Sequence, residues 1–429
     1  MMTMVTADGQ KEYALLEQLA ARSGEVDRRV TAAVTEILDT VRADGDAALR
    51  EYTRRFDGVD APVRSIPRGQ LEALAQKCSR RVYDALCRAA ENIRDFHRRQ
   101  LQQSWLTTRE DGTILGQRVR GLDKVGIYVP GGTAAYPSSV LMNAIPARIA
   151  GVREIIMVTP PPKNGEYNYD VMAAAYIAGV DRVILCGGAQ AVAALAYGTE
   201  TVPKVDKIVG PGNIYVATAK RKVFGKVGID MIAGPSEILV LADGTCNPAW
   251  VAADLLSQAE HDKLASPVLV TDSRDLAKAV QAELEVQIPQ LPRAAIARAS
   301  VDTNGKIIVT DDMNKAIEAV NIIAPEHLEI CVDDPFAVLN SVQNAGSIFL
   351  GKNVPEALGD YFAGPNHTLP TSGTARFSSP LGVDDFVKKS SFIYYTREAL
   401  GEVQGRIANF AEHEGLHAHA KSVTIRFEE

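Results

Sequence analysis

The sequence predicts an α/β protein made of two α/β units in tandem, preceded by a helical region and followed by a tail after about residue 381. From about residue 124 onward, short apolar strands alternate with helical segments, which is the order of a parallel sheet with helices on both faces. The length of 429 residues agrees with more than one unit, because single cores rarely grow beyond about 250–300 residues.

The first hundred residues are predicted to be mainly helical. Apolar residues recur at helical spacing between Val30 and Val41, and the segment is dense in Ala, Glu and Arg. The glycine-containing sequences at 44–46 and 56–58 are expected to separate one helix from the next.

Two series of strands and helices follow. Each predicted strand is a short, mostly apolar run, and several end in a glycine-containing turn. The first series has predicted strands at 125–129, 155–158, 183–186 and 207–209, with helices near 138–149, 171–178 and 191–197. The second series has predicted strands at 238–241, 268–270, 307–309, 328–331 and 348–350, with helices near 248–261, 274–285, 312–321 and 335–344.

The bulk composition excludes several classes of protein. A net charge of -7 gives no long-range basic field for nucleic acid. No apolar run reaches the ~18 residues of a membrane span, and the first residues lack the order of a secretory signal. The five cysteines are an odd number without a Cys-x-x-Cys pair, which indicates reduced thiols. We therefore expect a cytoplasmic protein that binds neither nucleic acid nor membranes.

Histidine is distributed unevenly along the chain. Only His97 lies in the N-terminal part, and the other six histidines lie from His261 onward, most of them beside a carboxylate or an amide. Histidine both ligates metals and titrates near neutral pH. The pattern therefore suggests a combined metal and acid/base site assembled from distant segments.

Gln258, His261 and Asp360 are candidate metal ligands. The first two are spaced i, i+3 near the end of a predicted helix, so they share a face and could direct an oxygen and a nitrogen at one ion. Asp360 is expected at the C-terminal edge of the second sheet, where α/β proteins usually bind ligands. The alternatives are a polar helix end for the pair and a turn-forming role for Asp360.

The sequence near the C-terminus offers two further histidine ligands. Gly415 could end a helix, and an extended chain beyond it would place His417 and His419 on one face. Two histidine nitrogens, an aspartate oxygen and an amide oxygen are a donor set that suits Zn²⁺. A solvated histidine-rich tail is the alternative interpretation.

Glu326 and His327 are the sharpest acid/base candidates. Neighbouring residues on a strand point to opposite faces, so the two can cooperate only if they lie in the turn before the strand, which Pro325 makes plausible. A carboxylate and an imidazole at one site could activate a water and move a proton. The alternative is a polar loop without function.

Signals for a nucleotide and for a cysteine nucleophile are weak. The chain has no G-x-G-x-x-G sequence, although strands that end in Gly-Gly can bring backbone N–H groups close to a phosphate. Cys186, Cys246 and Cys331 have no basic neighbour in the sequence, which favours buried or incidental thiols.

Five motifs together resemble one known family. They are Ile229–Glu237 (IDMIAGPSE), Leu256–Asp262 (LSQAEHD), Ala324–Glu329 (APEHLE), Gly364–Pro370 (GPNHTLP) and Glu412–Leu416 (EHEGL). In these motifs, and from about residue 12 to the end, the sequence resembles the histidinol dehydrogenase family.

The resemblance implies a zinc-containing, NAD-dependent homodimer of histidine biosynthesis. Members of the family oxidise L-histidinol to L-histidine through L-histidinaldehyde with two NAD⁺, and one zinc per subunit positions the substrate. On this resemblance His327 transfers protons and Glu326 activates water. The implied fold is two incomplete Rossmann-like units with an aldehyde-dehydrogenase-like architecture, which agrees with the missing glycine fingerprint.

The resemblance also implies a role for each matching residue. The implied zinc ligands are Gln258, His261, Asp360 and His419. The implied substrate contacts are Ser236, Gln258, His261, His327, Asp360, His367, Glu414 and His419. The residues that would face NAD are Tyr128, Gln190 and Asn213. Glu414 and His419 would reach the active site of the partner subunit. His417 could compete as a ligand, but it and His413 are expected to be bystanders.

The expected domain division follows from the same resemblance. Residues 1–22 would form an N-terminal arm. Residues 23–125 and 237–380 would form a first α/β domain with the metal and acid/base residues. Residues 126–236 would form a second α/β domain for NAD, and 381–429 would be a tail that reaches the partner subunit. The alternatives are a cysteine-dependent aldehyde dehydrogenase and a non-catalytic zinc- or nucleotide-binding protein.

Overall fold

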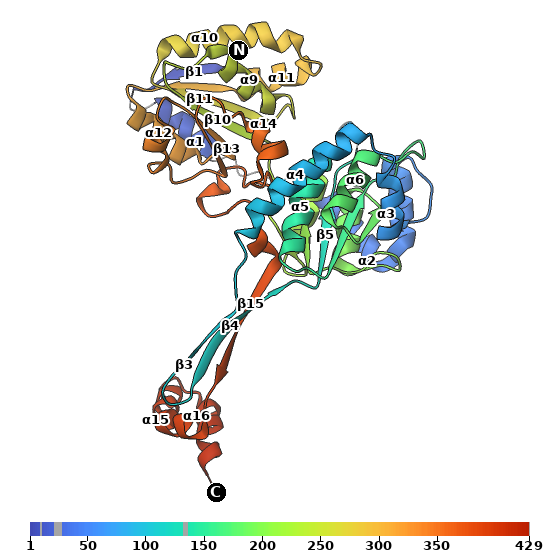
Figure 1. The fold of residues 1–429 in the computed structure, drawn as a ribbon, viewed down its shortest axis with the longest axis vertical. Coiled ribbons are helices and arrows are strands. Elements are labelled where there is room, and N and C mark those ends of the chain that lie inside the picture. The colour runs from blue at the N-terminus through green and yellow to red at the C-terminus, as the bar shows by residue number, and fades with distance from the viewer. Residues whose placement is uncertain (9–10, 21–27, 132–135, 429) are drawn as a thin grey trace.

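The protein folds into two α/β units and a long ribbon of strands that carries the C-terminal helices away from them (Figure 1). The computed structural model describes residues 1–8, 11–20, 28–131 and 136–428. Unit I is built on the sheet β1-β12-β11-β10-β13-β14, and unit II on the sheet β2-β7-β6-β5-β8-β9. The ribbon is the sheet β15-β4-β3.

Unit I has a parallel sheet that is covered on both faces. Helices α9, α10 and α11 pack on one face, and α1 and α12 pack on the other, which explains the nearly continuous apolar strands. Its strands are β1 (Thr3–Thr6), β10 (Glu237–Ala242), β11 (Ser266–Thr271), β12 (Lys306–Val309), β13 (His327–Cys331) and β14 (Ser347–Leu350). Its helices are α1 (Lys11–Ala20), α9 (Pro248–Ala259), α10 (Arg274–Gln287), α11 (Ala294–Thr303), α12 (Met313–Ile323), α13 (Pro335–Leu339) and α14 (Glu356–Leu358).

Unit II has the same layered plan. Helices α3 to α6 cover one face of its sheet and α2, α7 and α8 cover the other. Its strands are β2 (Ser65–Pro67), β5 (Lys124–Tyr128), β6 (Glu154–Thr159), β7 (Arg182–Leu185), β8 (Lys207–Val209) and β9 (Gly228–Ile229). Its helices are α2 (Arg28–Asp57), α3 (Arg68–Ala75), α4 (Arg80–Arg98), α5 (Pro137–Ile149), α6 (Tyr169–Ala178), α7 (Gly188–Tyr197) and α8 (Ile214–Val223).

Both sheets have the same strand order. Within each series the strands lie in the order third, second, first, fourth and fifth, with one extra strand from the N-terminal region at the edge. This is the Rossmann order without its sixth strand. The prediction of two incomplete Rossmann-like units is therefore confirmed.

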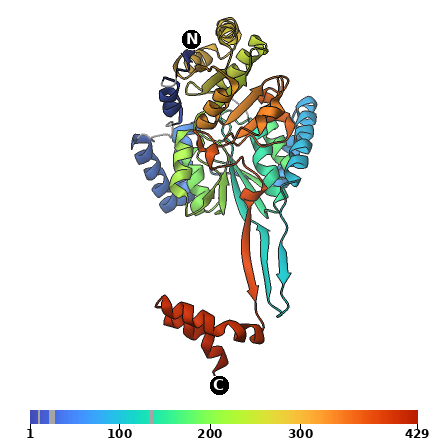
Figure 2. The same cartoon turned by 90° about the vertical axis from the view of Figure 1, so that its left-hand side faces the viewer.

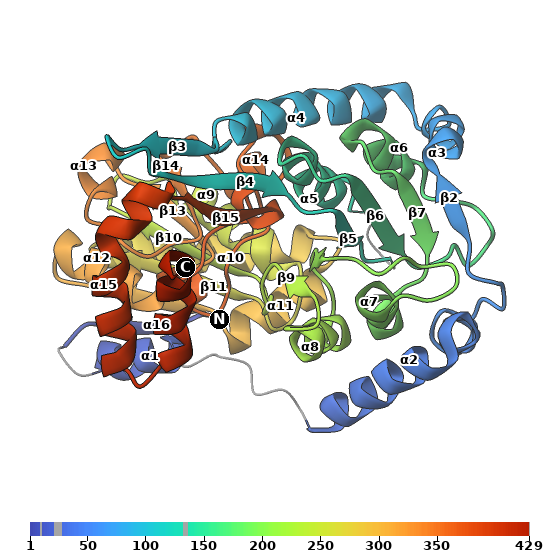
Figure 3. The ribbon, with the colours of Figure 1, turned by 90° about the horizontal axis from the view of Figure 1, so that it is seen from below.

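The ribbon and the C-terminal helices extend far beyond both units (Figure 2). The strands β3 (Trp105–Thr108), β4 (Ile114–Gly121) and β15 (Val387–Tyr394) are antiparallel. Helices α15 (Arg397–His413) and α16 (His417–Thr424) follow and lie side by side (Figure 3). Short 3-10 turns lie at Ile288–Gln290, Thr374–Arg376, Val383–Phe386 and Ile425–Phe427.

The chain near Gly415 forms a helix end followed by a second helix. Gly415 is left-handed (φ 75°), and its N–H donates to the Glu412 carbonyl while the Leu416 N–H donates to the Ala411 carbonyl. This pattern ends α15 as a Schellman motif. The extended chain expected beyond Gly415 is wrong, because residues 417–424 contain good helix formers and form α16.

The two units divide the chain differently from the expected domains. The segment 28–98, expected with 237–380, belongs to unit II: β2 pairs with β7, α2 packs on α7 and α8, and α3 and α4 pack on α6. The first residues are not a separate arm, because β1 extends the sheet of unit I. Of the expected arm, residues 9–10 and 21–22 lie outside the described residues. Across the described ranges, no helix is long and apolar enough to cross a membrane.

Candidate active site

Glu326 and His327 lie together at the start of β13. Helix α12 ends at Ile323, and Ala324 adopts a left-handed conformation (φ 52°) where the chain turns toward the strand. Glu326 is therefore the last residue before the strand and His327 is its first. The atoms Glu326 Oε2 and His327 Nδ1 are 3.7 Å apart. The structure thus brings the two candidate acid/base groups together at the junction of the turn and the strand.

The backbone of Glu237, the first residue of the neighbouring strand β10, holds both side chains. Its N–H donates to Glu326 Oε2 (2.8 Å), and its carbonyl accepts from His327 Nδ1 (2.9 Å). Because a carbonyl can only accept, Nδ1 carries a hydrogen, and the neutral ring keeps its lone pair on Nε2. His327 can therefore take up a proton at Nε2.

Two further carboxylates face this nitrogen. His327 Nε2 lies 3.8 Å from Glu356 Oε1 and 3.7 Å from Asp360 Oδ1. Glu356 begins the short helix α14, and Asp360 lies in the π-helical turn Gly359–Ala363 that follows it. The His327 side chain is 4% exposed and that of Glu356 is 3% exposed, so water does not screen these charges.

The electrostatics of the acid/base pair follow from this burial. Burial raises the pKa of the Glu326 carboxyl to about 8, and the Glu237 carboxylate acts in the same direction. Burial opposes charge on His327, but Glu326, Asp360 and Glu356 outweigh it and raise the pKa of His327 to about 10. Strongly shifted groups of this kind gather at catalytic sites.

Gln258 lies in the last turn of α9, and His261 follows the end of that helix. Gln258 is 1% exposed, and neither polar atom of its side-chain amide has a hydrogen-bond partner within the described residues. Burial lowers the pKa of His261. The nearby Asp360 carboxylate acts in the opposite direction, which places His261 close to Asp360. The Ser257 hydroxyl donates to Glu356 Oε2 (3.0 Å) and ties α9 to α14. Buried amides are nearly always hydrogen-bonded, so Gln258 is poised for a ligand that is not part of the chain.

The site lies at the amino ends of the strands of unit I. Strands β10 and β13 begin here, with Ile238 paired to His327. Helix α9 runs back after β10, so its C-terminal end reaches the same edge. Asp360 was expected at the C-terminal edge, and that expectation is wrong, because α14 and the π-helical turn return the chain from the end of β14 to His327.

His367 and Ser236 border the same region. The His367 ring donates from Nδ1 to the Asp360 carbonyl (3.0 Å), and its Nε2 lies 3.4 Å from the Ser139 hydroxyl of unit II. Burial lowers the pKa of His367 and favours its neutral form. Ser236 directly precedes β10 and Glu237. His367 therefore joins the two units at the site.

The structure does not bring Glu414 and His419 to this site within one chain. Glu414 ends α15 and His419 lies in α16, both exposed at the far end of the ribbon (Figure 2). His417 and His419 do not share a face of α16, because residues two positions apart in a helix are rotated by about 200° about its axis.

Tyr128, Gln190 and Asn213 gather at the carboxyl ends of the strands of unit II. Tyr128 ends β5, and its hydroxyl accepts from the Gly188 N–H (3.1 Å) at the start of α7. Gln190 lies in the first turn of α7, is 1% exposed, and makes no side-chain hydrogen bond within the described residues. Asn213 caps α8. The strand order reverses between β5 and β8, which is where such sheets bind nucleotides.

Comparison with known proteins identifies the family. The sequence profile described as histidinol dehydrogenase matches residues 20–427. The histidinol dehydrogenase of Syntrophotalea carbinolica is 56% identical over 431 residues, covering 100% of both chains. The chain belongs to the histidinol dehydrogenase family. The histidinol dehydrogenase of Clostridium acetobutylicum is 54% identical over 98% of this chain and 97% of its own. The crystal structure of histidinol dehydrogenase from Elizabethkingia anophelis superposes with a TM-score of 0.92 at 36% identity, covering 99% of this chain and 98% of the other.

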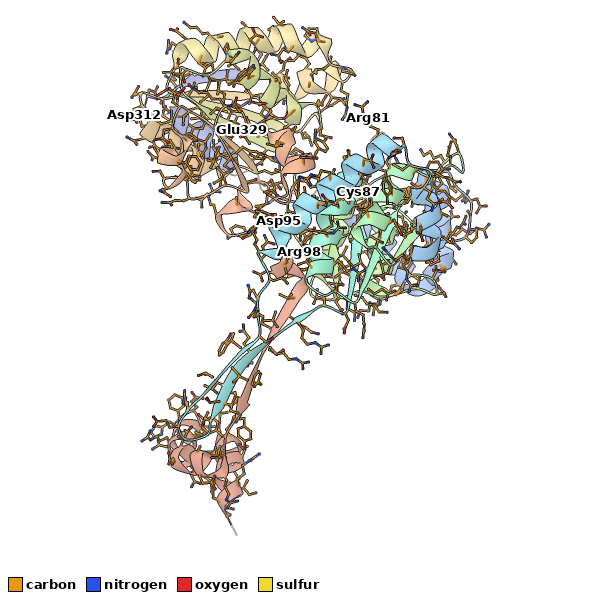
Figure 4. The ribbon with its side chains drawn as sticks, viewed as in Figure 1. Arg81, Cys87, Asp95, Arg98, Asp312 and Glu329 are labelled. Carbon is orange, nitrogen blue, oxygen red and sulfur yellow. The ribbon has the colours of Figure 1, made fainter. Side chains whose placement is uncertain are left out.

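The sequence patterns assigned no role to two groups that the structure places beside the site, Glu356 and Glu329, although Glu329 ends the motif Ala324–Glu329. Glu356 faces His327, and its spacing of four residues from Asp360, about one helical turn, is the signal that could have found it. Glu329 is fully buried in β13 within unit I (Figure 4), and its Oε1 accepts from the Glu356 N–H (2.7 Å). Burial, and then the Asp254 carboxylate, raise the pKa of Glu329 to about 9.

The thiols are poorly suited to nucleophilic catalysis in this member of the family. The thiolate is the reactive form, and a reactive thiol needs a lowered pKa. Burial instead raises the pKa of every cysteine: Cys78, Cys87, Cys186, Cys246 and Cys331.

Proposed function

We propose that the protein oxidises L-histidinol to L-histidine through L-histidinaldehyde, with two NAD⁺ as oxidant and zinc in the site. The observation that carries the proposal is the paired Glu326 and His327, both fixed on the Glu237 backbone. Such a pair serves two proton transfers of different kinds, as an alcohol oxidation followed by an aldehyde oxidation requires. The buried, unsatisfied amide of Gln258 near the end of α9 also supports the proposal.

The residues near the site fit a zinc ion. Gln258, His261 and Asp360 supply an amide oxygen, an imidazole nitrogen and a carboxylate oxygen, which are ordinary zinc donors, and the amide has no other partner within the described residues. The fourth ligand would be His419 of the partner subunit. Bound zinc would supply a Lewis acid that holds the substrate's amine and imidazole, and its positive charge would favour the neutral form of His327.

Each oxidation step uses a different member of the pair. In the first step Nε2 of neutral His327 accepts the hydroxyl proton while the carbinol carbon gives up its hydride to the nicotinamide. In the second step the ionised Glu326 carboxylate takes a proton from a water molecule while the oxygen of that water adds to the aldehyde carbon. The resulting hydrate anion then gives a hydride to the second NAD⁺ and becomes the carboxylic acid. The acidic surroundings of Asp360 and Glu356 suit a cationic substrate.

The cofactor would lie on unit II, beside Tyr128, Gln190 and Asn213. The N-termini of α7 and α8 point toward this edge, and helix N-termini attract the phosphates of a dinucleotide. His367 and Ser139 join this unit to the acid/base pair, which supports hydride transfer across the boundary between the units.

We further propose that the protein works as a homodimer with a shared active site. The ribbon and C-terminal helices expose large apolar side chains, including Leu106 (62%), Ile393 (72%) and Phe410 (71%). A monomer rarely exposes so much apolar surface in one region, so the tail is suited to pack on a second copy. Glu414 and His419 would then enter the partner's site, where they would contact substrate and zinc.

The test is direct measurement of NADH formation when the purified protein meets L-histidinol and NAD⁺. We expect the NADH absorbance to increase only when both compounds are present, and we expect prolonged treatment with a zinc chelator to abolish this increase. Alanine replacement of each cysteine should leave turnover in place. Turnover that a single cysteine replacement abolishes would instead support a cysteine-dependent aldehyde dehydrogenase.

A further inference from the structure

A buried ion pair underlies the loop that presents Asn213. Lys220 on α8 is 3% exposed, and its ammonium pairs with the Asp230 carboxylate, whose side chain is 1% exposed. Lys220 lies two helical turns after Asn213, and helical side chains lean toward the N-terminus of their helix. The ammonium therefore sits beneath the loop before α8 rather than beside the far end of the helix.

The pair holds both backbone groups of Gly210. The Gly210 N–H donates to Asp230 Oδ2 (2.8 Å), and the Gly210 carbonyl accepts from Lys220 Nζ (2.9 Å). Gly210 has a φ of 110°, and a Cβ there would lie 2.2 Å from the Tyr128 carbonyl oxygen. No side chain fits at this position. The ion pair therefore fixes the backbone of Gly210 by hydrogen bonds, and the close approach of β5 restricts position 210 to glycine.

The clamped loop connects directly to the residues on the nucleotide side. Gly210 follows β8, and three residues later Asn213 accepts from the backbone N–H groups of Tyr215 and Val216 to begin α8. Gly210 packs against the carbonyl oxygen of Tyr128. Tyr128 ends β5, the strand beside β8, and the strand order reverses between these two strands. A change in the pair would therefore move the loop between β8 and α8, at the edge where a dinucleotide would bind.

We propose that Lys220 and Asp230 are positioning residues for dinucleotide binding: they hold the loop 210–213 in the conformation that receives NAD⁺. This inference rests on the proposed function, because it takes the carboxyl edge of unit II as the cofactor site. Both side chains are buried. Both act through the backbone of Gly210.

The test uses a double variant that leaves no unpaired buried charge. Lys220→Met keeps the length of the side chain and removes the donor to the Gly210 carbonyl, and Asp230→Asn keeps an oxygen that can accept from the Gly210 N–H. We expect the dissociation constant of NADH, measured by fluorescence titration, to rise at least about tenfold, which corresponds to about 1.4 kcal/mol. The KM for NAD⁺ should rise in parallel, while the affinity for L-histidinol stays as in the wild type.

The matched control is Asp181→Asn at the opposite edge of the same sheet. Asp181 pairs with Arg148 (2.6 Å) and accepts from the Ile155 N–H (2.7 Å), so it too joins an ion pair to a sheet backbone. This control should lower the melting temperature and leave NADH binding unchanged.

Three results would overturn the inference. A folded double variant, or a folded Lys220→Met single variant, with wild-type NADH affinity would show that the pair does not position the loop. An equal loss of NADH affinity in Asp181→Asn would show a general effect of stability. Failure of both variants to fold while Asp181→Asn folds would make the pair a general structural element. Wild-type protein that binds no NADH would instead refute the proposed function, so its affinity is measured first.

Discussion

Replacing Glu326 with glutamine should separate the two oxidation steps. The amide oxygen of the introduced glutamine can accept from the Glu237 N–H as the carboxylate does at 2.8 Å, so the turn before β13 keeps its anchor. The substitution removes only the group that would take a proton from water. General-base assistance contributes about a hundredfold to ten-thousandfold, and the rate of aldehyde oxidation should fall by about that factor.

The alcohol step should change little in the same variant. Glu326 Oε2 lies 3.7 Å from His327 Nδ1, so its removal lowers the pKa of His327. A lower pKa increases the neutral fraction of the base and weakens its affinity for the proton, and these two effects oppose each other. The Glu237 carbonyl still fixes the ring with Nε2 free.

Single-turnover NADH measurements, begun once from L-histidinol and once from L-histidinaldehyde, distinguish the steps. The pKa of Glu326 is raised to about 8, so its reactive carboxylate forms as the pH rises through that value. Aldehyde oxidation by the wild type should therefore increase as the pH rises through the pKa of Glu326, and the variant should lack this increase. Equal losses from both substrates would refute the assignment of water activation to Glu326.

Three more substitutions test the surrounding groups. His419→Asn should lower the zinc content measured by elemental analysis while His417→Asn does not, because α16 directs the two rings to different sides; the reverse result would contradict the ligand assignment. Glu356→Gln should lower the pKa of His327 and so shift the pH dependence of the alcohol step to lower pH, and an unchanged single-turnover pH profile would show that Glu356 does not act on the base. Glu329→Gln should flatten the pH dependence of stability: because the Glu329 pKa is raised from 4.5 to about 9, the folded wild type loses up to about 1.4 kcal/mol per pH unit across that interval, and a variant whose melting temperature falls with pH as steeply as that of the wild type would contradict the raised pKa.

The α/β architecture was predictable because each strand and helix has its own local pattern of apolar residues and turn residues. Buried parallel strands are continuous apolar runs, as at 125–129 and 268–270, and glycine turns separate them from the helices. The incomplete Rossmann-like order followed only from the family resemblance, since no local sequence states which strands pair.

The division of the chain into units could not be predicted in the same way. The edge strands β1 and β2 lie about 300 and 115 residues from their partners in the sequence, and short strands with three or four residues carry little pattern of their own. The helices of the first hundred residues show an apolar face but not the sheet on which that face packs.

The sequence was sufficient to predict which residues could form the site, but not where in the fold the site lies. The motif around Pro325 indicated the turn that holds Glu326, although His327 is already the first residue of β13. The return of α14 to the amino edge of the sheet depends on tertiary packing. The position of Glu356 beside His327 was not predictable from the sequence, because only the fold brings Glu356 Oε1 within 3.8 Å of His327 Nε2. The alternating histidines at 417 and 419 predict an extended chain, but the residues around them form helix α16, so this local spacing does not determine the backbone.

The number of NADH molecules formed per L-histidinol tests the central claim most directly. With excess NAD⁺ and limiting L-histidinol, the account predicts two NADH and one L-histidine for each substrate consumed, with no accumulation of free aldehyde. One NADH with aldehyde released into solution would contradict the proposed second step at Glu326. The absence of NADH altogether would contradict the function proposed for this member of the family.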